Sequence, residues 1–138
     1  MKKYILLFAI LAMLPACDKD NFNNNNPFIP NYGFSEQINM DLPAYNQLLT
    51  PSSGIYYGGG GARGLLIFYT GSGYNAFDAA CPNEALSPCS TLQIDGINAV
   101  CPCNEAEYSL FTGQSPGLQY PLKPYAVQRN GNVLTIYN

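Results

Sequence analysis

The sequence predicts a small all-β domain built as a sandwich or barrel of antiparallel strands. The chain has 138 residues, which is enough for one small domain. It contains 11 tyrosines, 13 glycines and 11 prolines, a mixture that favours short strands and tight turns over long helices. Turn sequences also recur about every ten residues, the spacing typical of all-β folds.

Apolar runs give the expected strand positions in the first half of the domain. A first short strand is expected within 32–38, and Pro43 limits the following segment to one brief turn at 47–49. A short apolar run at 55–57 precedes Leu65 to Thr70, LLIFYT, which is the strongest candidate for a buried strand.

Turn signals organise the remaining strands into hairpins. Gly71-Ser72-Gly73 predicts a hairpin that returns as a strand at 74–79. Asp95-Gly96 predicts a second hairpin within 93–99. A further strand is expected at 107–111. Asn130-Gly131 predicts a terminal hairpin, whose strands are expected at 125–128 and 133–137.

The N-terminal segment has the pattern of an export signal. Lys2-Lys3 precedes an apolar run from Tyr4 to Leu14, which is shorter than the roughly 17–25 residues of a membrane-spanning helix. The run ends Leu14-Pro15-Ala16-Cys17, which resembles a bacterial lipobox. We therefore expect a lipoprotein signal peptide at 1–16 and acylation of Cys17; an ordinary cleaved signal with an incidental cysteine is the alternative.

A polar segment separates Cys17 from the predicted domain. Asp18-Lys19-Asp20 resembles the signal that directs some Bacteroidetes-type lipoproteins to the cell surface. The following NFNNNNPFIP is rich in Asn and Pro and predicts a tether spanning 17–31, with the domain at 32–138. The expected location is the cell envelope, with a lipid anchor in the outer membrane and the cell surface as a more specific alternative. The expected partners are the membrane, through the lipid, and another envelope protein.

The composition excludes several classes of function. The absence of histidine removes Ser-His-Asp and Cys-His catalysis and every His-ligated metal site. The glycine run at 58–61 lacks the Lys-Ser/Thr pair of a phosphate loop and is interpreted as a flexible turn. No basic stripe supports nucleic-acid binding. With neither a nucleophile setting nor a cofactor loop, we expect that the chain is not an enzyme.

Two cysteine segments carry the most informative pattern. The first reads Cys81-Pro82-Asn83, and the second reads Cys101-Pro102-Cys103-Asn104. Their spacing resembles the Rieske iron–sulfur family, which has Cys-x-His in one loop and Cys-x-x-His in the next. Flanking segments at 60–67, 110–113, 115–117 and 122–136 extend the resemblance from about residue 32 to the end. It implies a Rieske-like antiparallel β sandwich or barrel with a small subdomain of two cluster-binding-type loops.

The same segments depart from the family at both histidine positions. Cys81 and Cys101 match the cysteine ligands of the cluster, but Asn83 and Asn104 replace the histidines that hold the outer iron. A carboxamide is a weak ligand for iron that carries sulfide. We therefore expect no conventional [2Fe–2S] cluster and a structural or binding role. A genuine [2Fe–2S] electron-transfer protein with atypical ligation is the alternative.

The resemblance also implies how the cysteines pair. Cys89 and Cys103 match the extra cysteines that form a disulfide in the respiratory-type branch of the family. Cys81 and Cys101 would share one iron in the family, so their sulfurs are expected to be close. Without a cluster, in an oxidising compartment, these two are expected to form a second disulfide. In a less favoured alternative, Cys81, Cys89, Cys101 and Cys103 together bind zinc or an all-cysteine cluster.

Overall fold

The computed structural model describes residues 25–138, which form nine strands and one short 3-10 helix. All strand pairings are antiparallel. The elements in chain order are β1 (Ser35–Asn39), η1 (Asn46–Leu49), β2 (Ser53–Tyr57), β3 (Leu65–Tyr69), β4 (Tyr74–Asp78), β5 (Gln93–Asp95), β6 (Asn98–Val100), β7 (Glu107–Ser109), β8 (Pro124–Asn130) and β9 (Val133–Tyr137). The prediction of an all-β fold is confirmed.

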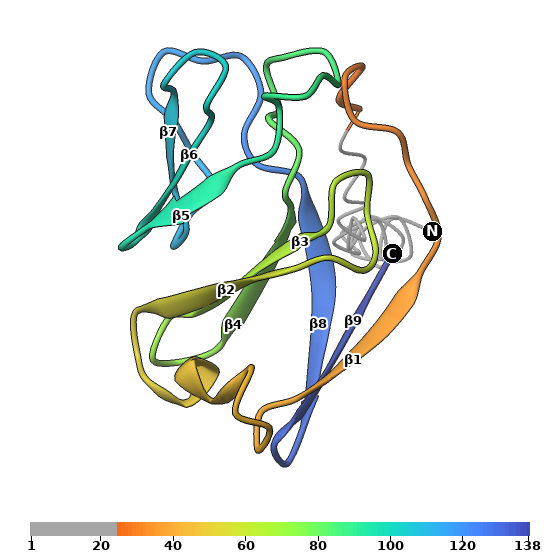
Figure 1. Ribbon diagram of the computed structural model, residues 1–138, viewed down its shortest axis with the longest axis vertical. Helices are drawn as coiled ribbons and strands as arrows, with labels where there is room; N and C mark the ends of the chain where they lie inside the picture. Colours follow the sequence, from red (N-terminus) through yellow and green to blue (C-terminus); the bar gives the residue numbers. More distant parts are fainter. Residues whose placement is uncertain (1–24) are drawn as a thin grey trace, which may run out of the picture.

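The strands form one large sheet and one small sheet. The large sheet has the order β1-β9-β8-β4-β3-β2, and the small sheet has the order β5-β6-β7. Figure 1 shows the small sheet and its loops at one end of the molecule, with η1 and the β8–β9 turn at the opposite end. The chain enters the small sheet after β4 and leaves it before β8, so the small sheet is an insertion between neighbouring strands of the large sheet.

Strand β3 explains how the two sheets share their cores. Its side chains alternate between the two faces of the sheet, as in any strand, and its first four residues are all fully buried. Leu65 and Ile67 contribute to a cluster inside the large sheet, whereas Leu66 and Phe68 contribute to a cluster between the two sheets. An uninterrupted apolar run is therefore required here, because neither face of β3 contacts solvent.

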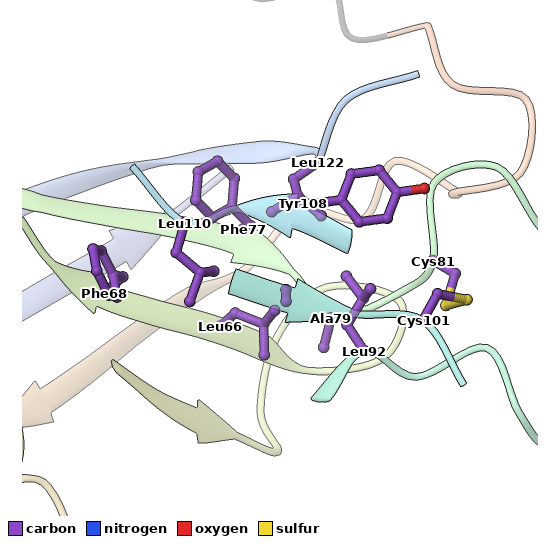
Figure 2. Packing of buried hydrophobic residues seen from close by; sticks show 11 residues of the cluster. Leu66, Phe68, Phe77, Ala79, Cys81, Leu92, Cys101, Tyr108, Leu110 and Leu122 are labelled. Atoms are coloured by element: carbon purple, nitrogen blue, oxygen red, sulfur yellow. A yellow bond between two sulfur atoms is a disulfide. The ribbon is translucent and has the colours of Figure 1, made fainter. Parts of the chain in front are cut away.

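The cluster between the sheets, called the inter-sheet core below, supports the loops of the small subdomain. It contains Leu66, Phe68, Phe77, Ala79, Cys81, Leu92, Ala99, Cys101, Tyr108, Leu110 and Leu122. Figure 2 shows these side chains between the strands, with Cys81 and Cys101 at one end of the cluster. The two cysteines are thus part of the packed core, and the loops that carry them are fixed to it.

The segment that precedes β1 lies against the domain. Asn26 is buried, and its Nδ2 donates a hydrogen bond to the Pro82 carbonyl at 2.8 Å. Ile29 is also buried. The buried Lys123 Nζ donates to the Pro30 carbonyl and to Asn31 Oδ1, both at 3.2 Å. The last part of the segment predicted as a tether therefore packs on the domain next to the first cysteine loop.

The predictions for the N-terminal region concern residues that the structure does not describe. The signal peptide, the Cys17 acylation site and the beginning of the tether lie outside residues 25–138. Within those residues, no helix is long and apolar enough to cross a membrane.

Candidate functional site

The candidate site lies where two loops meet beside the inter-sheet core. One loop connects β4 to β5 and carries Cys81 and Cys89; the other connects β6 to β7 and carries Cys101 and Cys103. Backbone hydrogen bonds fix both loops at their bases. The Cys81 amide donates to the Ser90 carbonyl at 2.9 Å, and the Cys101 amide donates to the Ala106 carbonyl at 2.9 Å.

Two disulfides join these loops. Cys81 is bonded to Cys101, with 5.7 Å between their Cα atoms, and Cys89 is bonded to Cys103, with 5.1 Å between theirs. Cys89–Cys103 is the pair that the Rieske resemblance implies, and Cys81–Cys101 is the pair expected in the absence of a cluster. Cys81 and Cys101 are completely buried, whereas Cys89 is exposed and Cys103 is half-buried. The structure thus places one covalent link inside the core and one at the surface.

Asn83, which the resemblance aligns with the first histidine, binds a third loop through its carboxamide. Its Nδ2 donates to the Tyr120 carbonyl at 2.8 Å, and its Oδ1 accepts from the Tyr120 amide at 3.0 Å. The same Nδ2 also donates to the hydroxyl of the buried Tyr108 at 2.8 Å. Both polar atoms of the carboxamide are therefore engaged within the protein.

The hydroxyl of Tyr108, a buried residue of the inter-sheet core, lies at Asn83. Figure 2 shows its ring in the inter-sheet core, with the hydroxyl oxygen at the end of the cluster where the cysteines lie. Burial raises the pKa of Tyr108 above its usual value of 10; the nearby Glu84 charge adds to this, and the hydrogen bond from Asn83 opposes it. The phenol is thus a neutral partner for Asn83 at ordinary pH.

Asn104, which the resemblance aligns with the second histidine, has an exposed side chain. Its Nδ2 donates to Glu84 Oε1 at 2.8 Å, and its Oδ1 accepts from the Ala106 amide at 3.0 Å. These bonds hold the tight turn at 101–106, where Glu105 has a positive φ of 60°. Asn104 therefore shapes its own loop and connects that loop to Glu84.

The donor set does not fit a Rieske cluster. The family arrangement needs two thiolates for one iron and two imidazoles for the other. Here the two sulfurs are bonded to each other, and Asn83 and Asn104 offer amides whose nitrogen and oxygen atoms have protein partners. The four-cysteine metal alternative meets the same obstacle, because a cysteine in a disulfide offers no thiolate. Residues 25–138 also contain no group of three His, Cys, Asp or Glu side chains arranged to hold a metal ion.

Sequence reasoning missed a buried carboxylate beside the site. Asp78, at the end of β4, is fully buried. Its Oδ2 accepts from the Ala62 amide at 2.6 Å and the Tyr125 hydroxyl at 2.7 Å. Its Oδ1 accepts from the Arg63 amide at 3.2 Å and the Ala80 amide at 2.8 Å. Four hydrogen-bond donors thus surround the carboxylate.

These contacts explain the glycine run. The loop that precedes β3 wraps its backbone around Asp78, so it is a fixed element of the core rather than a free turn. Gly61 has φ +63°, and a Cβ added there would lie 2.6 Å from Asp78 Oδ2. A glycine is required because a side chain would occupy the space of the carboxylate. The available signal was an aspartate within the apolar run of β4 that follows a glycine-rich segment.

An open cleft of about 820 Å³ lies next to the surface disulfide. Its walls come from β2, β5 and both cysteine loops. Its lining includes Gln47, Gly54, Ile55, Tyr56, Pro88, Cys89, Leu92, Gln93, Ile94 and Pro102. The strands β2 and β5 are each the outer strand of their own sheet. The cleft thus lies between two sheet edges, and Cys89 is part of its lining.

Comparison with known proteins gives likenesses of fold. No protein-family model matches the chain, and no curated protein does. The chain is similar to a structure described as a complex of reduced oxygenase and oxidized ferredoxin in carbazole 1,9a-dioxygenase, with 21% identity and a TM-score of 0.47 over 64% of this chain and 82% of that one. The corresponding values for Sphingomonas yanoikuyae B1 ferredoxin are 15% and 0.45, over 66% and 92%. A putative NADH-dependent nitrite reductase small subunit from Mycobacterium tuberculosis gives 13% and 0.47, over 78% and 97%.

Proposed function

We propose that the chain is an exported, lipid-anchored protein whose Rieske-like domain has a structural or binding role in the cell envelope and holds no conventional [2Fe–2S] cluster. One observation carries this proposal: the two cysteines at the family's ligand positions, Cys81 and Cys101, are bonded to each other inside the core. A disulfide there provides the cross-link between the two loops that a bound iron would otherwise provide.

The asparagines support the same proposal. A side chain that had merely lost its role as a ligand would be free to point into solvent. Asn83 instead makes three hydrogen bonds that connect two loops and the core. Each such bond contributes about 1 kcal/mol to stability. We therefore infer that these residues stabilise a cluster-free domain.

The proposed location rests on the sequence. An acylated Cys17 would leave four cysteines, and export would place them in a compartment that maintains disulfides. The domain would then be held near a membrane surface by the segment that leads to Asn26, where the described contacts with the domain begin. The membrane is the proposed partner through the lipid, and another envelope protein is the proposed partner of the domain.

The state of the cysteines tests the cluster-free part. The exported chain is purified aerobically, unfolded without reductant and treated with a thiol-alkylating reagent, and the modified residues are located by mass spectrometry. We expect no modification at Cys81 or Cys101. Free thiols at these two positions would contradict the proposal, because the loops would then lack their covalent link.

The mass of the exported chain tests the anchor. We expect an N-terminus at Cys17 that carries acyl chains, and flotation of the protein with membranes. The Cys17→Ser variant, which keeps the rest of the chain, is the matched control and should lose both properties. An unmodified N-terminus in the wild-type protein would overturn the anchor while leaving the conclusion about the cluster intact.

A further inference from the structure

The two disulfides differ in their access to solvent. The sulfurs of Cys81 and Cys101 belong to fully buried residues of the inter-sheet core. Cys89, in contrast, is exposed and lines the cleft between β2 and β5. A dissolved molecule can therefore reach the Cys89–Cys103 bond while the fold is intact, whereas the other bond is shielded by the core.

The geometry distinguishes the two sulfurs of the exposed bond. Cys89 lines the cleft, whereas Cys103 does not and packs against the inter-sheet core. A nucleophile that arrives through the cleft thus meets Cys89 first. Cys103 is then the sulfur that departs when the bond breaks, since thiol–disulfide exchange proceeds by attack on one sulfur and release of the other.

A hydroxyl contacts both sulfurs of the exposed bond, and a cationic side chain binds the loop that carries this hydroxyl. Ser87 Oγ is 3.3 Å from Cys89 Sγ and 3.6 Å from Cys103 Sγ, so it can donate a hydrogen bond to the sulfur that carries the charge. Arg63 Nη2 donates to the Ser87 carbonyl at 2.9 Å, which holds the guanidinium at the same loop. A nearby positive charge favours a thiolate over a thiol.

We propose that Cys89–Cys103 is a thiol–disulfide exchange site that accepts two electrons from a peptide or protein dithiol seated in the cleft. A thiolate of the partner attacks Cys89 Sγ, the Cys89–Cys103 bond breaks, and Cys103 departs as a thiolate that takes up a proton. The second thiol of the partner loses its proton and attacks the mixed disulfide, which releases Cys89. The partner ends as a disulfide, and Cys89 and Cys103 end as thiols.

The shape of the cleft indicates a peptide rather than a small thiol. Its walls include Gly54 to Tyr56 of β2 and Gln93-Ile94 of β5, and both strands are sheet edges. The edge of β5 can bind an extended peptide segment through main-chain hydrogen bonds. On the β2 side, the Gly54 carbonyl already accepts a hydrogen bond from Gln47 Nε2, so the peptide is expected to pair with β5. A cysteine carried on such a segment would be delivered to Cys89. This proposal goes beyond the structural or binding role and depends on neither the lipid anchor nor the absence of a cluster.

The test follows exchange in the folded, oxidised full chain. The protein is incubated separately with glutathione and with an unstructured peptide that carries two cysteines among β-branched residues. Samples are quenched in acid and alkylated, and the modified cysteines are mapped. We expect Cys89 and Cys103 to be reduced together while Cys81–Cys101 stays intact and the near-UV circular dichroism is retained. The transient adduct should lie on Cys89, and the peptide should react about tenfold faster than glutathione.

Two variants test the assigned roles. Ser87→Ala keeps the backbone contacts of the loop and should slow exchange several-fold, up to about tenfold, because the departing thiolate loses its donor. Arg63→Gln removes the charge and the donor to the Ser87 carbonyl, and should also slow exchange. Ser72→Ala, in the exposed β3–β4 turn, is the matched control and should react at the wild-type rate.

Four results would overturn the proposal. Reduction of all four cysteines in one step with loss of the circular dichroism signal would show that the exposed bond opens only on unfolding. An adduct on Cys103 would reverse the assigned roles of the sulfurs. Equal exchange rates with glutathione and the peptide would show that the cleft does not bind a peptide partner. A wild-type exchange rate in both Ser87→Ala and Arg63→Gln would show that neither residue stabilises the departing thiolate.

Discussion

The carboxamide of Asn83 pairs with the backbone of Tyr120, donating to its carbonyl at 2.8 Å and accepting from its amide at 3.0 Å. The two residues are 37 positions apart, and the pairing ties the first cysteine loop to the loop that leads into β8. The resemblance to Rieske domains implies a histidine at position 83, directed at a metal. Here the same position links two loops of the protein.

This pairing predicts a large loss of stability in Asn83→Ala. Three hydrogen bonds are lost, including the one to the buried Tyr108 hydroxyl, and the free energy of unfolding should fall by about 2–4 kcal/mol. Asn104→Ala is the matched control, since that side chain is exposed, and should cost about 1 kcal/mol or less. Denaturant unfolding measures both. Equal losses would show that Asn83 has no special structural role.

The glycine loop predicts a second contrast between neighbouring positions. Gly61→Ala places a methyl group 2.6 Å from Asp78 Oδ2 at a residue with positive φ, so stability should fall by about 2 kcal/mol or more. At Gly58, an added Cβ meets nothing within 4 Å, and Gly58→Ala should change stability by about 0.5 kcal/mol or less. Thermal unfolding measures the stability of both variants. A loss at Gly61 but not at Gly58 would show that the loop is fixed around Asp78. A tolerated Gly61→Ala would mean that Asp78 is not enclosed as described.

The buried tyrosine next to Asp78 predicts how stability depends on alkaline pH. Burial, the hydrogen bond to Asp78 and the charge of that carboxylate raise the pKa of Tyr125 above its usual value of 10. The folded state thus holds the phenol proton more tightly than the unfolded chain. The resulting stabilisation is complete below pH 10 and decreases as the pH rises above it, by up to about 1.4 kcal/mol per pH unit.

Tyr125→Phe tests this dependence. The variant should be less stable at neutral pH because the Asp78 carboxylate loses one donor, but its stability should fall less steeply above pH 10. Tyr32→Phe, at an exposed tyrosine, should leave the slope unchanged. Denaturant unfolding at several pH values between neutral and strongly alkaline provides the measurement. Identical slopes in wild type and Tyr125→Phe would disprove the assignment to Tyr125.

The surface disulfide predicts a defined contribution to stability. Cys89 and Cys103 are separated by 14 positions, and a loop of this size contributes about 3 kcal/mol when it is closed by a bond. Replacing both by Ser should reduce the free energy of unfolding by that amount and leave the domain folded, because the Cys81–Cys101 bond remains. Unchanged stability would show that the bond does not constrain the unfolded chain. Failure of the double variant to fold would show that the inner bond alone cannot hold the loops.

Local sequence patterns predicted most of the fold. The uninterrupted LLIFY run predicted the buried strand β3, and Asn130-Gly131 predicted the β8–β9 turn, where Asn130 is paired with Val133. These features depend on neighbouring residues. The disulfide pairs follow from a resemblance to a family, since spacing alone does not define which cysteines approach each other.

The contacts that define the site could not be predicted from the sequence, because they join residues that are far apart in the chain. Nothing near Asn83 indicates that its partner is the backbone of Tyr120. The interpretation of the glycine run as a turn was also incomplete. The carboxylate of Asp78, which this loop encloses, lies 16 positions beyond Ala62 and 15 beyond Arg63, whose amides donate to it. Such contacts arise only when the sheets pack and bring their loops together.

The iron and acid-labile sulfide content, together with a visible spectrum of the exported chain purified without oxygen, shows whether the domain holds a cluster. Anaerobic purification protects any cluster from loss, so a negative result is informative. We expect no iron, no sulfide and no colour in a protein that melts cooperatively. About two irons and two sulfides per chain with a coloured cluster would contradict it, because Cys81 and Cys101 would then be ligands rather than a disulfide.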